Sequence, residues 1–275
     1  MLAPRSPRCP PMLFPLSDDD RHLDGPAVAT IAFLVLNALV FAYQLSEPSF
    51  TYGWSVVPEE LTTGQDLVND RPIPEEDPNV EITSAREIPQ REGPGPAPLV
   101  YLTIFTAMFM HGGWGHIAGN MLYLWIFGDN VEHRFGTARF VAFYLVSGIV
   151  ATLVQVAMDP DGLVPNLGAS GAIAGVLGAY LVLFPRNRVN AVFIIRVVTV
   201  PAIVVLGLWI VLQFVNQWGA TAATEETGGV AYGAHIGGFL AGMAMGLVAK
   251  ATGTRERPNR LTAAIESDPH NRRLW

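Results

Sequence analysis

The chain has 275 residues, of which 50% are hydrophobic and 15% charged, and its formal net charge at pH 7 is -7. This composition is too apolar for a water-soluble domain of that length and predicts a membrane protein. The single cysteine, Cys9, excludes an intrachain disulfide, and the lack of a basic run argues against nucleic acid as a partner.

The N-terminal third of the sequence alternates between polar segments and one apolar run. Residues 1–25 are rich in proline and charge and lack helical periodicity, so we expect a flexible tail. The run Ala27–Leu45 is long enough to stay in the bilayer as an anchor and does not resemble a cleavable signal. Residues 46–98 are polar and rich in proline, and we expect a long loop outside the hydrocarbon.

The remaining sequence contains five further apolar runs that we expect to cross the membrane. Leu99–Met110 is too short to cross and is followed by Gly112-Gly113, which predicts an interfacial or partly inserted segment. Arg196 belongs to the predicted span Ala191–Phe214 and lies near enough to one end of it to reach the membrane surface. The predicted spans are Trp114–Gly128, Val141–Met158, Ser170–Phe184, Ala191–Phe214 and Val230–Val248.

The distribution of basic residues sets the expected orientation. With both termini in the cytoplasm, all 17 Lys and Arg lie in cytoplasmic segments except Arg71, Arg86 and Arg91 of the long loop. We therefore predict an all-α membrane protein, a bundle of six transmembrane helices in the plasma or inner membrane with both termini cytoplasmic. Its parts are a flexible tail (1–25), a membrane domain (26–250) with an extracytoplasmic loop insertion (46–98), and a second tail (251–275).

Ionisable residues are costly in a bilayer, so those within the predicted spans limit the chemistry that is possible. No Asp or Glu lies in any span, which excludes an intramembrane aspartyl protease and argues against a proton-coupled carrier. No His-Glu-x-x-His motif is present, so the ligands of a membrane zinc protease are missing and we expect no metal.

Four polar residues fall at equivalent positions in three spans. The second, fourth and sixth spans all run from outside to inside, and each begins with one of these residues within about its first two turns. His116 and Asn120 are spaced i, i+4 and share a helical face, while Ser170 and His235 lie within the first two turns of the other two spans. We expect all four side chains at one depth, slightly below the outer surface.

Acyl transfer requires the groups that these residues carry. A serine hydroxyl becomes nucleophilic when a base takes its proton, and His235 is the candidate base for Ser170. The resulting oxyanion needs donors, which the Ser170 backbone N–H, the Asn120 amide and the His116 ring can supply. With no acid in the spans, the sequence predicts a Ser-His dyad and no triad.

The stretch Gly168–Gly175 also admits a purely structural interpretation, because small residues let membrane helices pack closely. Gly171 and Gly175 are four residues apart, as are Gly238 and Gly242 in the sixth span. Smooth faces of this kind would let the two helices approach until Ser170 meets His235. Close packing and catalysis are compatible here.

Three motifs together resemble the signature set of the rhomboid intramembrane serine proteases, and the resemblance extends from about Leu99 to Val248. They are Gly168-Ala169-Ser170-Gly171, His116-x-x-x-Asn120 and Ala234-His235-x-Gly-Gly. The resemblance implies a six-helix core that cleaves transmembrane segments of other proteins in the lipid bilayer, without a cofactor. It implies Ser170 as nucleophile, His235 as general base, and His116 with Asn120 as the oxyanion-stabilising pair. The segments His111-Gly112-Gly113 and Glu132-x-Arg134 are similar to family positions that hold loops.

The chain departs from the family pattern at two places. Some members have an aromatic residue four positions after the serine that stacks on the histidine, where this chain has Ala174. Some have Trp-Arg before the second span, where Leu102-Thr103 stands. By family analogy the fifth span gates substrate access, which makes Phe214 and Trp218 candidate gate residues; the alternative role for both is anchoring at the lipid interface.

Two other functions remain as alternatives. A catalytically silent relative that binds transmembrane helices would typically lack the serine or the histidine, and this chain keeps both. A small-molecule channel or carrier would be expected to show charges at the membrane midplane or inverted repeats, and the sequence has neither.

Overall fold

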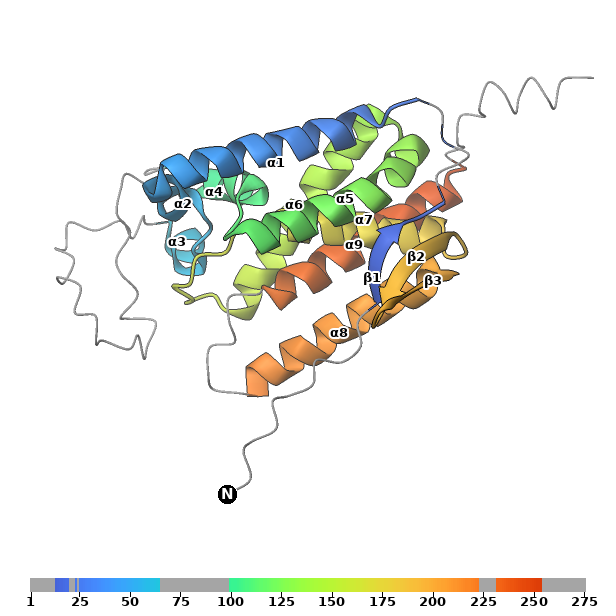
Figure 1. The fold of residues 1–275 in the computed structure, drawn as a ribbon. Helices are drawn as coiled ribbons and strands as arrows, with labels where there is room; N and C mark the ends of the chain where they lie inside the picture. Colours follow the sequence, from blue (N-terminus) through green and yellow to red (C-terminus); the bar gives the residue numbers. More distant parts are fainter. Residues whose placement is uncertain (1–12, 20–22, 24, 65–98, 223–230, 254–275) are drawn as a thin grey trace, which may run out of the picture.

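The computed structural model describes residues 13–19, 23, 25–64, 99–222 and 231–253, and most of these residues are helical (Figure 1). The long helices are α1 (Val28–Ser46), α5 (Trp114–Phe135), α6 (Thr137–Met158), α7 (Ser170–Leu183), α8 (Ala202–Ala222) and α9 (Tyr232–Ala251). Among the described residues, four helices are long and apolar enough to cross a membrane: α1, α6, α8 and α9. The protein is therefore a mainly helical, multi-pass membrane protein.

Helix α7 lies at the centre of the bundle. Every residue from Gly171 to Tyr180 is buried, and the helix packs against α5, α6, α8 and α9. Such a helix is apolar on all sides because its neighbours, and neither water nor lipid, surround it. The residue at its N-terminal end, Ser170, is half-buried.

Helices α7 and α9 touch through their backbones, as the glycine spacing predicted. A methyl group added at Gly238 would collide with the carbonyl oxygen of Gly171, and one at Gly242 with that of Gly175. Without side chains at these positions the two helices approach more closely than ordinary helix pairs. The prediction of smooth facing surfaces is confirmed.

Glu132 joins the N-terminal ends of two helices to α5. Its carboxylate accepts hydrogen bonds from the backbone N–H groups of Ala29 (2.9 Å) and Thr30 (2.8 Å), which belong to the first turn of α1 and have no acceptor within that helix. It also accepts from the hydroxyls of Thr30 (2.8 Å) and Thr137 (2.9 Å). A buried carboxylate with four donors is well compensated, and the structural role expected of Glu132-x-Arg134 holds for Glu132.

The prediction of a fifth span over Ala191–Phe214 is wrong in its first half. Strands β2 (Arg188–Phe193) and β3 (Arg196–Pro201) form an antiparallel hairpin there, and α8 begins only at Ala202. The segment is rich in β-branched Val, Ile and Thr, which pack well in a sheet but look equally apolar to a hydropathy window. Arg196 therefore starts a strand and does not lie in a membrane helix.

The N-terminal segment also differs from the expected flexible tail. Leu13–Ser17 forms strand β1, which pairs antiparallel with β2 and gives a sheet of order β1-β2-β3. Just after the strand, Asp18 accepts hydrogen bonds from the Tyr180 hydroxyl and from Nδ2 of Asn130 (2.9 Å). These contacts tie the segment to α7 and α5. The rest of residues 1–25 lies largely outside the described residues.

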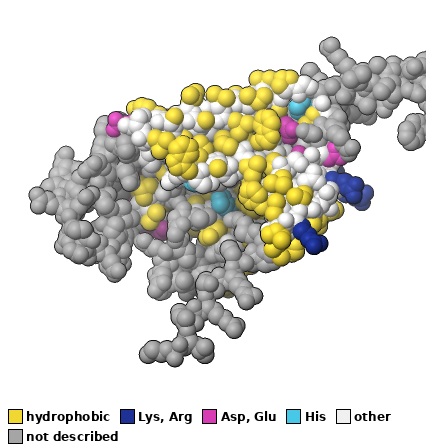
Figure 2. All heavy atoms as spheres, viewed as in Figure 1, with side chains coloured by type: hydrophobic (Ala, Val, Ile, Leu, Met, Phe, Trp, Pro, Cys, Tyr) yellow, Lys and Arg dark blue, Asp and Glu magenta, His cyan; other side chains and the backbone are white. Residues whose placement is uncertain are grey.

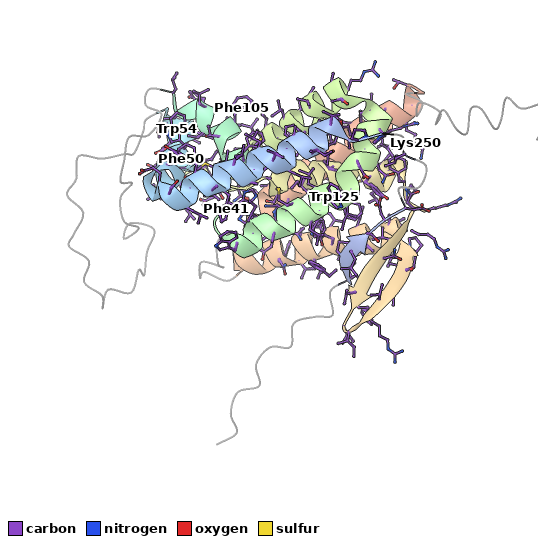
Figure 3. All side chains as sticks on the ribbon, turned by 45° about the horizontal axis from the view of Figure 1, so that its top comes forward. Phe41, Phe50, Trp54, Phe105, Trp125 and Lys250 are labelled. Carbon is purple, nitrogen blue, oxygen red and sulfur yellow. The ribbon has the colours of Figure 1, made fainter. Side chains whose placement is uncertain are left out.

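The short helices lie at the opposite end of the bundle from the sheet (Figure 1). They are α2 (Pro48–Trp54), α3 (Pro58–Thr63), η2 (Val100–Leu102), α4 (Thr103–Thr106) and η3 (Ala107–Phe109). The last three replace the continuous interfacial segment that Leu99–Met110 predicted. Phe50, Trp54 and Phe105 lie at this end and Lys250 at the other (Figure 3).

The surface of the bundle is apolar, as expected for contact with lipid. Hydrophobic atoms cover the face formed by α1 and α5, and the Lys and Arg side chains visible on it lie at the sheet end (Figure 2). Exposed hydrophobic side chains of α1 include Val28, Ile31, Val35, Leu36 and Leu39. Those of α8 include Ile203, Val204, Leu208, Val211, Phe214, Val215 and Trp218.

Candidate active site

The structure brings the N-terminal ends of α5, α7 and α9 together, and the four predicted polar residues lie there. Ser170 is the first residue of α7, and His235 lies in the first turn of α9. His116 and Asn120 occupy the first two turns of α5. All three helices begin at the end of the bundle that carries α2 and α3 (Figure 1).

Ser170 and His235 are in direct contact. The serine Oγ lies 2.9 Å from Nε2 of the histidine, within hydrogen-bond distance, although the residues are 65 positions apart. The start of α9 is held in place by Gln155 of α6, whose Oε1 accepts a hydrogen bond from the Ala234 N–H at 3.1 Å. The imidazole is thus fixed by its own helix at a level where it can receive the serine proton.

The second ring nitrogen of His235 contacts a residue that the sequence did not single out. Nδ1 lies 2.8 Å from Oε1 of Gln213, a buried amide of α8. A polar side chain within an otherwise apolar span is expensive in lipid, and that cost was the available signal for Gln213. The Trp209 ring, one turn earlier on α8, lies 5.7 Å from the imidazole, measured between ring centroids.

His116 lies against the loop that precedes Ser170. A methyl group added at Gly168 would lie 2.9 Å from Nε2 of His116 and 3.5 Å from Oγ of Ser170. Gly168 also has φ of +134°, so a side chain there is excluded by both space and backbone conformation. Nδ1 of His116 accepts the Gly112 N–H at 3.3 Å, so a neutral ring carries its proton on Nε2, the nitrogen facing Gly168.

Asn120 contributes an amide group with an unused donor. The side chain is buried, and among the described residues its Nδ2 has no hydrogen-bond partner. A buried amide N–H without an acceptor is costly, and such groups in native proteins call for an explanation. The first N–H groups of α7 are also available, because the first turn of a helix lacks intrahelical acceptors.

His111 is buried, lies next to His116 and has a structural role. Its backbone is bracketed by the side-chain amide of Gln44, which accepts the His111 N–H (2.9 Å) and donates to its carbonyl (3.2 Å). Burial, with a smaller effect of nearby His116, lowers the pKa of the His111 imidazole to about 4. The neutral ring packs edge-on against Phe41 and His116.

The candidate gate residues lie on the outside of α8. Phe214 is 49% exposed and Trp218 is 80% exposed, so about half of Phe214 and most of Trp218 face the surroundings of the bundle. Exposed aromatic side chains on a membrane helix are typical of contact with lipid.

Among the described residues, no group of three or more His, Cys, Asp or Glu side chains could hold a metal ion.

Comparison with known proteins gives matches over the same part of the chain. A family model described as the Rhomboid domain matches residues 99–251. The mitochondrial Rhomboid protein 1 of Saccharomyces cerevisiae is 30% identical over 167 residues, which are 59% of this chain and 46% of that protein. Rhomboid protease GluP of Bacillus subtilis is 34% identical over 52% of this chain and 26% of its own length.

A third relative is Rhomboid protease GlpG of Salmonella paratyphi A, which is 28% identical over 52% of this chain and 47% of its own length. The matched region thus spans less than half the length of each of these three relatives. The range 99–251 matched by the family model includes Ser170, His235, His116 and Asn120.

Proposed function

Because this chain belongs to the rhomboid family, we propose that it is an intramembrane serine endopeptidase that hydrolyses peptide bonds in or near transmembrane segments of other membrane proteins. The names of two relatives, GluP and GlpG, describe them as rhomboid proteases. The substrates of this chain would be single helices that reach the site from the lipid bilayer.

The observation that carries the proposal is the 2.9 Å contact between Ser170 Oγ and His235 Nε2. In the proposed reaction, Nε2 takes the hydroxyl proton as Oγ attacks the scissile carbonyl carbon. The tetrahedral intermediate then collapses, the protonated imidazole gives its proton to the leaving amine, and an acyl-serine remains. Water, activated by the same histidine, hydrolyses this ester and restores the serine.

Three groups are suited to stabilise the oxyanion. The Nδ2 donor of Asn120 is buried and without a partner among the described residues, and a developing negative charge would satisfy it. The Nε2 proton of His116 faces the Gly168 loop, and the N–H of Ser170 begins α7, where the helix dipole favours negative charge. The position of His116 against the loop that precedes Ser170, and the placement of Asn120 one turn further along α5, support the assignment of His116, Asn120 and the Ser170 backbone to this role.

We further propose that all six long helices cross the membrane, with both termini in the cytoplasm of a cell whose plasma or inner membrane holds the protein. The N-terminal tail would be 1–25, the membrane domain 26–250 with the loop insertion 46–98, and the C-terminal tail 251–275. Helix α7 has 14 residues and is about 21 Å long, less than the ~30 Å of the hydrocarbon. A short central helix supports a position of Ser170 below the outer surface, within reach of water.

Labelling by a fluorophosphonate probe tests the proposal directly. We expect the purified protein to be modified at Ser170, and the modification to be lost in His235→Ala, because the unactivated hydroxyl is a poor nucleophile. A well-folded protein that never reacts with the probe would contradict the proposal. That result would favour the alternative, a catalytically silent relative that binds transmembrane helices.

A further inference from the structure

Gln213 is a buried amide on a helix whose neighbouring side chains are almost all apolar. It is 8% exposed and sits in the middle of α8, between the exposed hydrophobic residues Val211 and Phe214. Both of its amide atoms have partners: Nε2 donates to the Trp209 carbonyl at 3.4 Å, and Oε1 lies 2.8 Å from Nδ1 of His235. The amide is therefore oriented by its own helix with its oxygen toward the imidazole.

This orientation decides which nitrogen of His235 holds the proton. An amide oxygen can only accept a hydrogen bond, so Nδ1 of the imidazole must be the donor. In the neutral ring Nε2 is then unprotonated, and it faces the Ser170 hydroxyl at 2.9 Å. This is the tautomer in which Nε2 can take the serine proton, and the second partner of a histidine commonly sets the tautomer in this way.

Trp209 holds the same ring by contact. Its indole is tilted by 39° to the imidazole at 5.7 Å between centroids, and it also packs on Phe239 of α9 at 6.0 Å. Trp209 and Gln213 are four residues apart and share one face of α8. The chain has Ala174 at the position where some rhomboid proteases place a stacking aromatic residue, and α8 supplies an aromatic ring instead.

We propose that Gln213, assisted by Trp209, is the positioning residue that holds His235 in the tautomer and orientation needed to activate Ser170. This inference rests on the proposed protease function. It gives α8 a direct role in the chemistry, because His235 is held in the required tautomer and orientation only while α8 packs against α9.

The test compares amide-to-leucine changes on the inner and outer sides of the same helix. We expect Gln213→Leu to slow fluorophosphonate labelling of Ser170 roughly 10- to 100-fold, less than the ~10⁴-fold effect of losing a charged orienting carboxylate in a triad. Gln213→Glu keeps an acceptor oxygen and should retain most of the labelling rate. Asn216→Leu, at an exposed position of α8, should react as the wild type does.

A spectroscopic measurement separates positioning from packing. With ¹⁵N-labelled histidine, the His235 signals, assigned by their loss in His235→Ala, should report Nδ1 protonation in the wild type and a shift toward Nε2 protonation in Gln213→Leu. Slower labelling with an unchanged tautomer, or unchanged labelling, would overturn the role of Gln213. Absence of labelling in the folded wild type would instead refute the proposed function. If Gln213→Leu folds poorly, Gln213→Met, which is closer in shape, takes its place in both measurements.

Discussion

Asn120 is the residue whose contribution to turnover is easiest to isolate. Its Nδ2 lacks a partner among the described residues, so removing this donor breaks no hydrogen bond that it makes there in the resting protein. If the proposed function holds, we expect Asn120→Ala to lower turnover of a transmembrane substrate by roughly 10²- to 10³-fold, as the loss of one oxyanion donor does in serine proteases. Turnover is measured by gel-based cleavage in liposomes.

The thermal unfolding midpoint of Asn120→Ala serves as the control. It should stay near that of the wild type, because a buried unpaired donor adds nothing to stability. A variant that keeps the wild-type rate would remove Asn120 from the oxyanion site.

Glu132 shows the opposite use of a buried polar group. Its carboxylate is saturated by the four donors described above, two of them backbone N–H groups of α1 that have no acceptor within the helix. Nothing is left over for a substrate, and the side chain lies on the part of α5 far from Ser170. A buried polar residue thus indicates chemistry only when its hydrogen-bonding capacity is incomplete, or when its partner is itself reactive, as for Gln213 and His235.

At the scale of elements, the contact between α7 and α9 determines the distance between Ser170 and His235, the proposed nucleophile and base. A methyl group at Gly242 meets the backbone of Gly175, which cannot move aside as a flexible side chain would. We expect Gly242→Ala to force the helices apart, lowering stability by about 1–3 kcal/mol. Because Ser170 and His235 sit on these two helices, fluorophosphonate labelling should fall at least roughly 10-fold, a loss measured at a temperature well below unfolding.

Gly207→Ala in α8 is the matched control, since an added methyl group there meets nothing within 4 Å. It should label at the wild-type rate. Equal rates for the two variants would show that the glycine faces are not what holds Ser170 to His235.

The long helices and the residues of the candidate site could be predicted because their signals are local. Ser170, both histidines of the site and Asn120 lie near the starts of three apolar runs. Once the direction of those runs across the membrane is known, the four side chains can be placed at the same depth. The β2-β3 hairpin could not be predicted in this way, because Val189–Val200 is both apolar enough for a span and β-branched enough for a sheet. The hairpin ends at Pro201, directly before α8 begins at Ala202.

Gln213 and strand β1 escaped prediction for a different reason: both depend on partners far away in the sequence. The Gln213 amide is explained only by a histidine 22 positions later on another helix. Strand β1 has a partner that follows it by well over a hundred residues, and a short segment of mixed composition carries no local sign of such pairing. Non-local pairing of this kind is visible only in the folded chain.

At the scale of the whole molecule, the proposed topology can be tested with single cysteines. In a Cys9→Ser background, Ile195→Cys would place the only thiol at an 88% exposed position of the hairpin turn, and Thr63→Cys would place it at the exposed end of α3. We expect a membrane-impermeant maleimide to label Thr63→Cys in intact cells, and Ile195→Cys only after the membrane is opened. Labelling of both from the same side would contradict the six-helix topology.

The pairing of β1 with β2 limits how many times the chain between these strands can cross the membrane. Strands that share backbone hydrogen bonds lie in the same compartment, so the chain between Ser17 and Arg188 must traverse the bilayer an even number of times. In the proposed topology, helices α1, α5, α6 and α7 would satisfy this with one passage each. A further passage by Leu99–Met110 would make the count odd, and that segment must therefore leave the bilayer on the face where it began.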